Sequence, residues 1–567
     1  MHFKINKTFL LFPFLTLLLL LSSCKEKTKK ADLIITNAVI WTGNPNQKEV
    51  QAMAISGDAV LALGTNQEMN ELRGKKTKMV DARGNFITPG FIDSHVHLLQ
   101  GGNSLLSVML RDAKTPAEFT KRIADFTEKL APGEWILEGN WDHTLWGGAL
   151  PVKEWIDKYT LDNPVVVYRL DGHMLLANSA ALKYAGIDKN TRDVPEGEIV
   201  RDKNGNPTGI LKGNAMLLMQ DKIPELTQLQ KTNALKAAMV YFAANGVTSV
   251  HDLDSLSSYK TAKKQEKKHD LTLRIYGARP LNKWIEIADT DLQNDKWLKR
   301  GLLKGFVDGT LGSHTAAFNA DYTDKANDKG FLITDQKKLS EWIFSADKAN
   351  LNITVHAIGD HAIHTILTIY EDLITKNGKK DRRLRVEHAQ HIAPEDMRKF
   401  AELGIIASVQ PYHAIDDGRW AEKLIGPERI KTTYAFKSLL DAKTKVVFGS
   451  DWPVAPTSPL LGIYAAVTRR TLDGKNPNGW IPEQKITVEQ ALNAYTKDAA
   501  YASFDEKVKG TLEPGKLADF VIINGDLTKI DPVKIKDLSV LMTYVGGKKV
   551  YDSSKKKPRT VTIKVKR

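Results

Sequence analysis

The sequence predicts an α/β protein: a (β/α)8 TIM-like barrel with a small β-sandwich built from both termini and a large insertion after barrel strand 1. Short β-branched runs bounded by Gly, Pro or charged residues recur along the chain, and helical stretches separate most of the later ones. Alternating strands and helices are typical of a closed parallel barrel, with a doubly wound open sheet as the alternative. The eight expected barrel strands are residues 90–95, 247–250, 271–276, 302–307, 353–356, 384–388, 405–409 and 445–448.

Strand patterns at the two ends of the chain predict the sandwich. Residues 31–41 alternate like a strand, and similar short strands are expected at residues 59–63, 518–523, 540–545 and 550–551. The simplest arrangement joins residues 31–88 and 501–567 in one small β-module. The barrel then occupies residues 89–500, with helices expected at residues 362–376 and 394–403.

One stretch inside the barrel region is too long to be a simple loop. Residues 98–245 separate the first two expected barrel strands, far more than one strand–helix connection needs. We therefore expect an inserted subdomain over the barrel mouth, in which residues 163–173 form a strand that enters a loop.

The composition excludes several classes of protein. Hydrophobic residues make up 42% of the 567 residues and charged residues 26%, which argues against a disordered or fibrous chain. The net charge of +14 raises the question of nucleic-acid binding, but the lysines are spread along the whole chain. We therefore predict a solvated basic surface and no nucleic-acid partner.

The N-terminus predicts export. Lys4 and Lys7 precede an apolar run and then Leu21-Ser-Ser-Cys24, which is typical of a secretory signal and resembles a bacterial lipoprotein box. In lipoproteins the cysteine at this position is lipidated, so residues 1–24 are expected to be a signal peptide and residues 25–30 a tether. The prediction is an exported, membrane-anchored lipoprotein on the periplasmic or cell-surface side; the alternative is an ordinary signal peptide with an incidental cysteine. Cys24 is the only cysteine, so no disulfide is expected.

Polar residues at the ends of the expected barrel strands are the main indication of chemistry. His95 and His97 are two positions apart and so share one face of a strand, while His356, His388 and Asp451 each end another apolar strand or its extension. Strand ends of this kind face the mouth of a barrel. Four imidazoles and a carboxylate suit Zn²⁺ or a similar transition metal, although each histidine taken alone could be an ordinary hydrogen-bonded residue.

Seven motifs give the chain a family resemblance over residues 31–551. They are Pro89-Gly-Phe-Ile-Asp-Ser-His-Val-His97, Asp171-Gly-His173, Lys304-Gly-Phe-Val-Asp-Gly-Thr-Leu-Gly-Ser-His314, Val355-His-Ala-Ile-Gly-Asp360, Val386-Glu-His388, Gln410-Pro-Tyr-His413 and Phe448-Gly-Ser-Asp-Trp-Pro453. Together they resemble the amidohydrolase superfamily, in the branch that includes YtcJ-like proteins and N-substituted formamide deformylases. The resemblance implies a barrel flanked by a β-sandwich and hydrolysis of a non-peptide C–N bond in a small molecule.

The resemblance also implies a ligand set for one or two divalent metal ions, with zinc the expected ion. His95, His97 and Asp451 would hold the buried ion, and Lys304, His356 and His388 would complete the pair. In related proteins the lysine at the Lys304 position is carboxylated and bridges two metals; the alternative is an unmodified lysine beside one metal. Asp451 would take the proton of the attacking water and deliver it to the leaving amine.

Further candidates line the expected mouth. His173 and His413 are candidate catalytic residues that could donate a hydrogen bond to the substrate or its oxyanion, and a structural role is the alternative for both. Asp171, Asp308, His314 and Trp452 are candidate substrate contacts. Trp141 and Trp146 could likewise form apolar walls or belong to the core, and Asp360 is expected to cap a helix.

Two other functions remain open at this stage. A metal-dependent barrel could hydrolyse an ester or phosphoester, because an activated water does not itself select the bond. The chain could also be a non-catalytic binding lipoprotein that has kept the barrel, although a complete ligand set argues against that.

Overall fold

The computed structural model describes residues 1–2, 29–169, 174–195, 197–288 and 295–555. Its centre is one sheet of eight strands that follow one another around the barrel in chain order, and all seven neighbouring pairs are parallel. The strands are β8 (Phe91–Val96), β14 (Val247–Asp252), β15 (Arg274–Pro280), β16 (Leu298–Phe306), β17 (Asn352–Ala357), β18 (Arg385–His388), β19 (Ile406–Val409) and β20 (Val446–Phe448).

The gap between the first and last strands is bridged without a regular ladder. Val96 and Trp452 form an isolated parallel bridge, and the Asp451 amide donates to the His95 carbonyl oxygen at 2.7 Å. The sheet is thus a nearly closed barrel, which confirms the predicted fold class.

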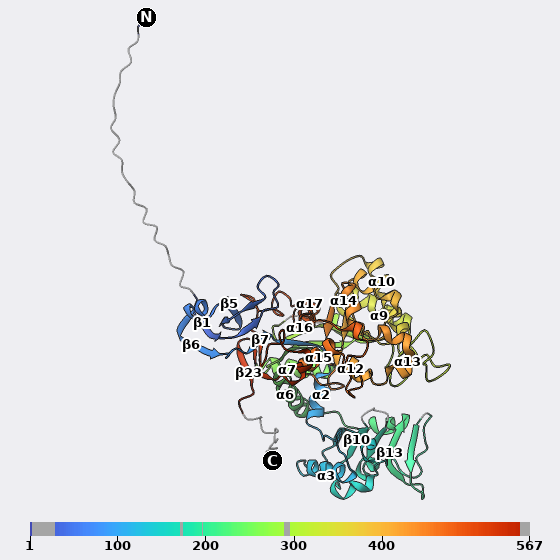
Figure 1. Ribbon diagram of the computed structural model, residues 1–567. Helices are drawn as coiled ribbons and strands as arrows, with labels where there is room; N and C mark the ends of the chain where they lie inside the picture. The colour runs from blue at the N-terminus through green and yellow to red at the C-terminus, as the bar shows by residue number, and fades with distance from the viewer. Residues whose placement is uncertain (3–28, 170–173, 196, 289–294, 556–567) are drawn as a thin grey trace.

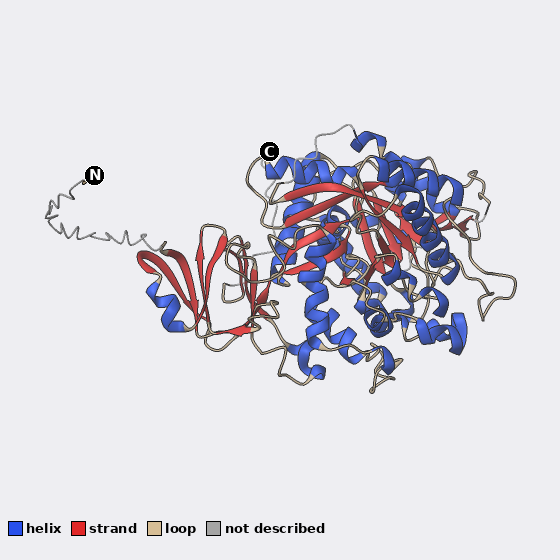
Figure 2. Cartoon of the chain, turned by 90° about the horizontal axis from the view of Figure 1, so that it is seen from above, coloured by secondary structure: helices blue, strands red, loops and turns tan. Residues whose placement is uncertain are grey.

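Helices cover the outside of the barrel (Figure 2). In α10 (Asp360–Asn377) the apolar side chains at helical spacing, such as Ile363, Ile366 and Tyr370, are all buried. The remaining helices of this region are α7 (Leu256–Glu266), α8 (Ile285–Ala288), α9 (Gln336–Lys348), α11 (Lys399–Glu402), α12 (Pro411–Asp417), α13 (Ala421–Arg429), α14 (Phe436–Asp441), α15 (Pro459–Thr468), α16 (Val488–Tyr495) and α17 (Lys497–Ala502).

One predicted helix is interrupted. Residues 394–403 form a 3-10 turn, Pro394–Asp396, and then the single turn of α11. Asp396 is fully buried and bonds His364 of α10 and Lys399, so its side chain points inward and ties the segment to its neighbour. The helix predicted over residues 362–376 is confirmed as α10.

The two ends of the chain share one β-sandwich beside the barrel (Figures 1 and 2). Its six-stranded sheet has the order β23-β22-β21-β7-β2-β3, and the antiparallel pairing of β7 with β21 joins N-terminal to C-terminal residues. Its four-stranded sheet has the order β5-β4-β1-β6. The elements are β1 (Ala31–Thr36), β2 (Val39–Trp41), β3 (Glu49–Val50), β4 (Ala52–Ser56), β5 (Ala59–Gly64), α1 (Asn66–Glu71), β6 (Arg73–Asp81), β7 (Phe86–Pro89), β21 (Phe520–Ile523), β22 (Val540–Val545) and β23 (Lys548–Asp552).

The expected insertion is a separate lobe with its own sheet (Figure 1, blue-green to green). Five strands in the order β12-β13-β11-β10-β9 carry it: β9 (Ile136–Trp141), β10 (Val165–Arg169), β11 (Met174–Ala177), β12 (Gly197–Arg201) and β13 (Pro207–Gly213). Its helices are α3 (Pro116–Thr127), α4 (Ser179–Ala185) and α5 (Leu217–Gln220). At the two ends of the insertion, α2 (Leu98–Leu105) and α6 (Gln228–Ala244) lie against each other, and α6 also contacts β14 and β23.

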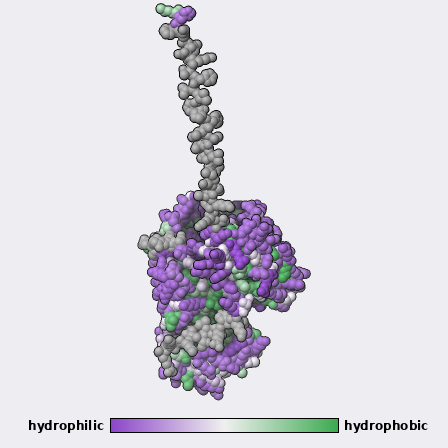
Figure 3. Space-filling model, turned by 90° about the vertical axis from the view of Figure 1, so that its left-hand side faces the viewer, coloured by the Kyte–Doolittle hydropathy of each residue, from purple (hydrophilic) through white to green (hydrophobic). Residues whose placement is uncertain are grey.

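The face drawn in Figure 3 is mostly hydrophilic, with small scattered hydrophobic areas. Within the part of the chain that the structure describes, no helix combines the length and the apolar composition that a membrane crossing requires.

Candidate metal centre

Four histidines and one aspartate meet at the rim where the barrel strands end. His95 lies in β8, and His97 comes directly before α2; His356 lies in β17, and His388 ends β18. Asp451 lies beyond the end of β20, separated from the strand by Gly449 and Ser450. Because parallel strands all end at the same face of a barrel, residues far apart in the sequence converge here.

Asp451 is common to two groups of donor atoms. Its Oδ1 lies 3.3 Å from His95 Nε2 and 3.2 Å from His97 Nε2. A second group joins Asp451 to His388 and His413, and within each group the donor atoms lie within 4.8 Å of one another. Metal–ligand bonds are about 2.0–2.2 Å long, so donors at these separations can share one ion.

Three of the histidines have one ring nitrogen already tied to an oxygen. His95 Nδ1 lies 2.7 Å from Glu387 Oε2, His388 Nδ1 2.8 Å from Gln410 Oε1, and His356 Nε2 2.9 Å from the Gly309 carbonyl oxygen. A neutral imidazole that donates through one nitrogen keeps a lone pair on the other. These three rings therefore have the tautomers that metal-binding histidines normally have.

The expected protonation states also suit a metal site. Burial, reinforced by the nearby Lys304 charge, lowers the pKa of His95 to about 4 and that of His356 to about 3. The pKa of His388 is lowered well below its usual value, again mainly by burial. Burial alone would raise the pKa of Asp451, but the surrounding histidines hold it well below its usual value. Three neutral imidazoles beside an ionised carboxylate have the forms that bind divalent cations. His97 differs, because burial is outweighed by its hydrogen bond to Asp451 and the charge of that carboxylate, and its pKa is raised.

The backbone around Asp451 is held in an unusual conformation. Asp451 has a φ of +59°, and its amide is fixed by the His95 carbonyl oxygen. The buried Asp93 of β8 accepts hydrogen bonds from the Ser450 amide at 2.8 Å, the Ser450 hydroxyl at 2.6 Å and the Thr457 hydroxyl at 3.0 Å. Asp93 thus ties the loop that carries Asp451 to the strand that carries His95.

Two further carboxylates hold the turn after His97. Asp252 at the end of β14 accepts from the Leu98 amide at 3.0 Å, and Asp254 accepts from the Leu99 and Gln100 amides. These amides belong to the first turn of α2, where backbone N–H groups have no partner within the helix, and His97 directly precedes that turn. Sequence reasoning did not single out these residues, nor Asp93, Glu387 and Gln410, although Asp93, Glu387 and Gln410 stand inside the quoted motifs.

Lys304 is buried and has no polar partner among the residues that the structure describes. Its side chain lies in β16, is 5% exposed and has neither a hydrogen bond nor an ion pair among the described residues. Its Nζ lies 5.1 Å from the centre of the Phe306 ring. Burial lowers the pKa of the amine to about 8. A lysine in this state is more often neutral and hence more nucleophilic than a solvated one.

The remaining catalytic and lipidation candidates are divided between described and undescribed residues. Asp171, His173 and Cys24 lie outside the described residues. His413 lies in the first turn of α12, and its buried Nε2 has no hydrogen-bond partner in the described part of the chain.

Two of the candidate substrate contacts belong to the loop after β16. Asp308 is fully buried and accepts from the amides of Ala317, Ile358 and Gly359, so its carboxylate holds loops together. His314 bonds Asp328 at 3.1 Å and stacks on Tyr322.

The aromatic candidates are part of hydrophobic cores. Trp452 is 4% exposed and lies against Tyr241 and Phe242 of α6, at ring distances of 5.4 and 5.1 Å. Trp141 and Trp146 contact Phe119 within the insertion. Asp360 is the first residue of α10, where Gly359 is the N-cap, and its carboxylate accepts from the Asn319 amide.

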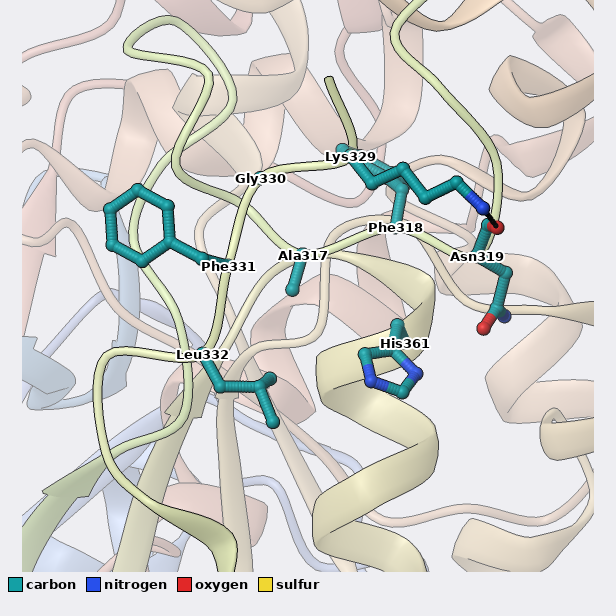
Figure 4. A pocket seen from close by; sticks show the side chains of 8 residues that line it. All are labelled: Ala317, Phe318, Asn319, Lys329, Gly330, Phe331, Leu332 and His361. Carbon is teal, nitrogen blue, oxygen red and sulfur yellow. Dashed lines mark hydrogen bonds between the residues drawn. The ribbon is translucent and has the colours of Figure 1, made fainter. Parts of the chain in front are cut away.

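A separate surface cavity of about 340 Å³ lies between the loop after β16 and the first turn of α10 (Figure 4). Lys329 Nζ donates to the Asn319 carbonyl oxygen across one side of it, at 2.9 Å. None of the predicted metal ligands lines this cavity. Its lining residues are Ala317, Phe318, Asn319, Lys329, Gly330, Phe331, Leu332 and His361.

Comparison with known proteins gives full-length relatives. The chain is 40% identical over 540 residues to the Arabidopsis thaliana protein LONG AFTER FAR-RED 3, with 92% of each chain covered. It is 28% identical to the putative amidohydrolase YtcJ of Bacillus subtilis (strain 168), covering 91% of this chain and 98% of that one. It is also 28% identical to N-substituted formamide deformylase of Arthrobacter pascens, with 92% and 98% covered. These relatives confirm the predicted branch.

A solved structure and a family model agree with these relatives. An uncharacterized metal-dependent hydrolase from Pyrococcus furiosus superposes with a TM-score of 0.74 at 28% identity, covering 88% of this chain and all of that one. The model described as "Amidohydrolase family" matches residues 78–551. With this match, the fold and the histidine–aspartate site, the chain belongs to the amidohydrolase family and is a metal-dependent hydrolase of that superfamily.

Proposed function

We propose that this protein hydrolyses a non-peptide C–N bond, in an amide, formamide or cyclic amide, of a small-molecule substrate. The observation that carries the proposal is the set of buried histidines around Asp451: three rings have one nitrogen tied to an oxygen, and the other nitrogen of His95 faces Asp451. The choice of bond is supported by the similarity to N-substituted formamide deformylase over nearly the whole chain.

His95, His97 and Asp451 would hold one divalent ion, with zinc expected, and Lys304, His356 and His388 would hold a second. When bound, the metal polarises the scissile carbonyl group and lowers the pKa of the attacking water. Asp451 accepts the proton of that water and delivers it to the leaving nitrogen as the C–N bond breaks. His413, whose Nε2 is buried and unpartnered among the described residues, can donate a hydrogen bond to the carbonyl oxygen.

Lys304 would join the second group as a carbamate. Its neutral amine attacks CO2, a C–N bond forms, and the proton lost from nitrogen passes to solvent. The carbamate is anionic, so it offsets the charge of two cations where an ammonium would repel them. The support for this step is a buried lysine that lacks a polar partner within the described residues.

Phe306 gives the mouth of the site an apolar wall. The residue is 44% exposed, and its ring lies 5.4 Å from the ring of His356. Phe306 and His356 are also paired directly between the neighbouring strands β16 and β17. A large exposed aromatic side chain next to a metal ligand favours a substrate with an apolar group close to the scissile bond.

The export hypothesis is a second, separate part of the proposal. We propose that the chain is a lipoprotein anchored through Cys24, on the strength of the Leu21-Ser-Ser-Cys24 sequence behind a basic and apolar leader. Cys24→Ala should move the protein from the membrane fraction to the soluble fraction of expressing cells. An unchanged distribution would remove the anchor.

Metal analysis of the purified protein, followed by a substrate panel, tests the function. We expect one or two zinc ions per chain and turnover of N-substituted formamides, N-acyl compounds or lactams. Ester or phosphoester turnover in place of amide turnover would move the reaction to a different bond. Bound metal with no turnover across the whole panel would favour a binding protein.

A further inference from the structure

Glu387 is a fully buried carboxylate in the interior of the barrel. It lies in β18, one residue before His388, and its Oε2 accepts a hydrogen bond from His95 Nδ1 at 2.7 Å. The bond joins two strands that are not neighbours in the sheet: four strands, β14 to β17, lie between β8 and β18 in the strand order. The contact therefore crosses the barrel interior.

The other oxygen of Glu387 is held just as firmly. Oε1 lies 2.6 Å from a terminal nitrogen of Arg385 and accepts a short hydrogen bond from the Thr354 hydroxyl of β17. With both oxygens engaged and no exposed surface, the carboxylate cannot turn away from His95.

Arg385 is itself anchored by three further strands. Its guanidinium donates to the Ser94 carbonyl oxygen in β8 at 2.7 Å, to His251 Nδ1 in β14 at 2.8 Å and to the Ser408 hydroxyl in β19 at 3.0 Å. Both terminal nitrogens of the guanidinium are held, although Arg385 Nε and His251 Nε2 have no hydrogen-bond partner among the described residues. Each of these buried bonds is strengthened by the low local dielectric. Glu387 is thus the end of a rigid assembly that reaches His95.

We infer that Glu387 is a positioning residue that sets the tautomer and ring orientation of His95, an inference that rests on the metal centre proposed above. By accepting the Nδ1 hydrogen, Glu387 leaves the lone pair of His95 on Nε2, the atom that faces Asp451 at 3.3 Å. Carboxylates placed behind a metal-binding histidine typically change metal affinity by 10- to 100-fold when they are removed. β18 would therefore carry both a metal ligand, His388, and the residue that orients a second ligand, His95.

Glu387→Gln is the direct test. A glutamine has one acceptor oxygen, and Arg385 competes for it with His95. The amide oxygen should stay with the arginine, so the amide NH2 faces His95 and favours the tautomer with hydrogen on Nε2. After metal removal with a chelator, we expect the Kd for Zn²⁺, measured by competition with a chromophoric chelator, to rise by about 10- to 100-fold. The Co²⁺ absorption spectrum should also change.

Asp519→Asn is the matched control. Asp519 is likewise a buried carboxylate paired with an arginine, since its oxygens lie 2.6 and 2.9 Å from two nitrogens of Arg274, but the pair lies at the opposite end of the barrel. The same chemical change there should lower stability and leave the Zn²⁺ Kd within about twofold of the wild-type value, because distant sites act independently.

The outcomes separate this inference from the proposed function. A wild-type protein that binds no metal would overturn the proposed centre. Wild-type binding with an unchanged Kd and spectrum in Glu387→Gln would leave Glu387 as the counter-charge of Arg385 only. If Glu387→Gln does not fold, Glu387→Asp, whose carboxylate is one methylene shorter and so withdrawn from His95, replaces it with the same expected direction.

Discussion

The two ends of the barrel both bury charged groups, but they satisfy them differently. At the N-terminal ends of the strands, each of three cations meets a carboxylate: Arg274 meets Asp519 at 2.6 Å, Lys299 meets Asp505 at 3.0 Å, and Arg383 meets Glu506 at 2.8 Å. Asp519 directly precedes β21, and Asp505 and Glu506 follow α17, so the pairs fasten the C-terminal part of the chain to the barrel.

At the C-terminal ends, polar groups are left without partners. Within the described parts of the chain, Lys304 Nζ and His413 Nε2 have no hydrogen-bond partner, and the rings of His356 and His388 each keep one nitrogen without one. Leaving buried polar groups unsatisfied costs free energy, so native proteins tolerate it mainly where a ligand completes the site. The paired end holds the fold together, and the unpaired end is built for chemistry.

Asp451→Asn should have the largest effect on function and separates the two ends most clearly. Asparagine tolerates the positive φ of this position, so the fold should stay intact. It cannot take up the proton of water, so kcat should fall by about 10²- to 10⁴-fold. Turnover of a panel substrate, with circular dichroism and metal content measured on the same sample, checks this. An unchanged rate would remove the role assigned to Asp451.

Arg274→Met should have the opposite effect: it should lower the stability of the fold and leave turnover unchanged. It leaves Asp519 as a buried carboxylate without its arginine, which typically costs ~3–5 kcal/mol of folding free energy. The urea midpoint should fall, while kcat at a temperature where the variant is folded should stay close to the wild-type value. A loss of turnover in the folded variant would show that the two ends are coupled, against the division drawn here.

The sequence was sufficient for the barrel because buried parallel strands are continuous apolar runs, which stand out between helices. It located the strands better than their ends. The third barrel strand was expected at residues 271–276 and is Arg274–Pro280, since its last residues, including Arg279, carry no apolar signal. The insertion was expected from length alone. Of its five strands only β10 was expected, within residues 163–173, because short strands such as β9 give little periodicity.

At the site, sequence reasoning found the histidines and Asp451, since they follow apolar strands and strand ends meet in a barrel. It did not assign roles to Glu387 or Asp93. A single acidic residue in a strand usually faces solvent. The roles of these two follow only from their hydrogen-bond partners, which are distant in the sequence: His95 is 292 positions from Glu387, and Ser450 is 357 positions from Asp93. Such partners depend on the closure of the barrel, which no local pattern encodes.

Lys304→Ala tests the most unusual group of the unpaired end. If Lys304 is a bridging carbamate, the variant should hold one ion fewer per chain than the wild type, and turnover should fall by about 100-fold, or ~2.7 kcal/mol in the barrier. Metal analysis by atomic emission and a steady-state assay measure both. Two ions per chain and full activity in the variant would exclude the bridge and leave Lys304 unmodified.

Asp505→Asn gives the smallest expected effect and probes the paired end by pH. Burial acts to raise the pKa of Asp505, but the ammonium groups of Lys509 and Lys299 outweigh it and bring the pKa from 3.8 to about 2. A carboxyl group whose pKa is lower in the folded than in the unfolded protein stabilises the fold above the unfolded value, and this contribution is lost as the pH falls through the folded value. Asp505 should therefore contribute about 2 kcal/mol to the free energy of unfolding near neutral pH, and this contribution disappears between about pH 4 and pH 2.

Urea unfolding of wild type and Asp505→Asn across this range should give free energies of unfolding that differ at pH 5 and converge at pH 2. A difference that stays constant with pH would mean that Asp505 acts through its shape and hydrogen bonds and not through its charge, and the paired end would then owe its stability to something other than ion pairs.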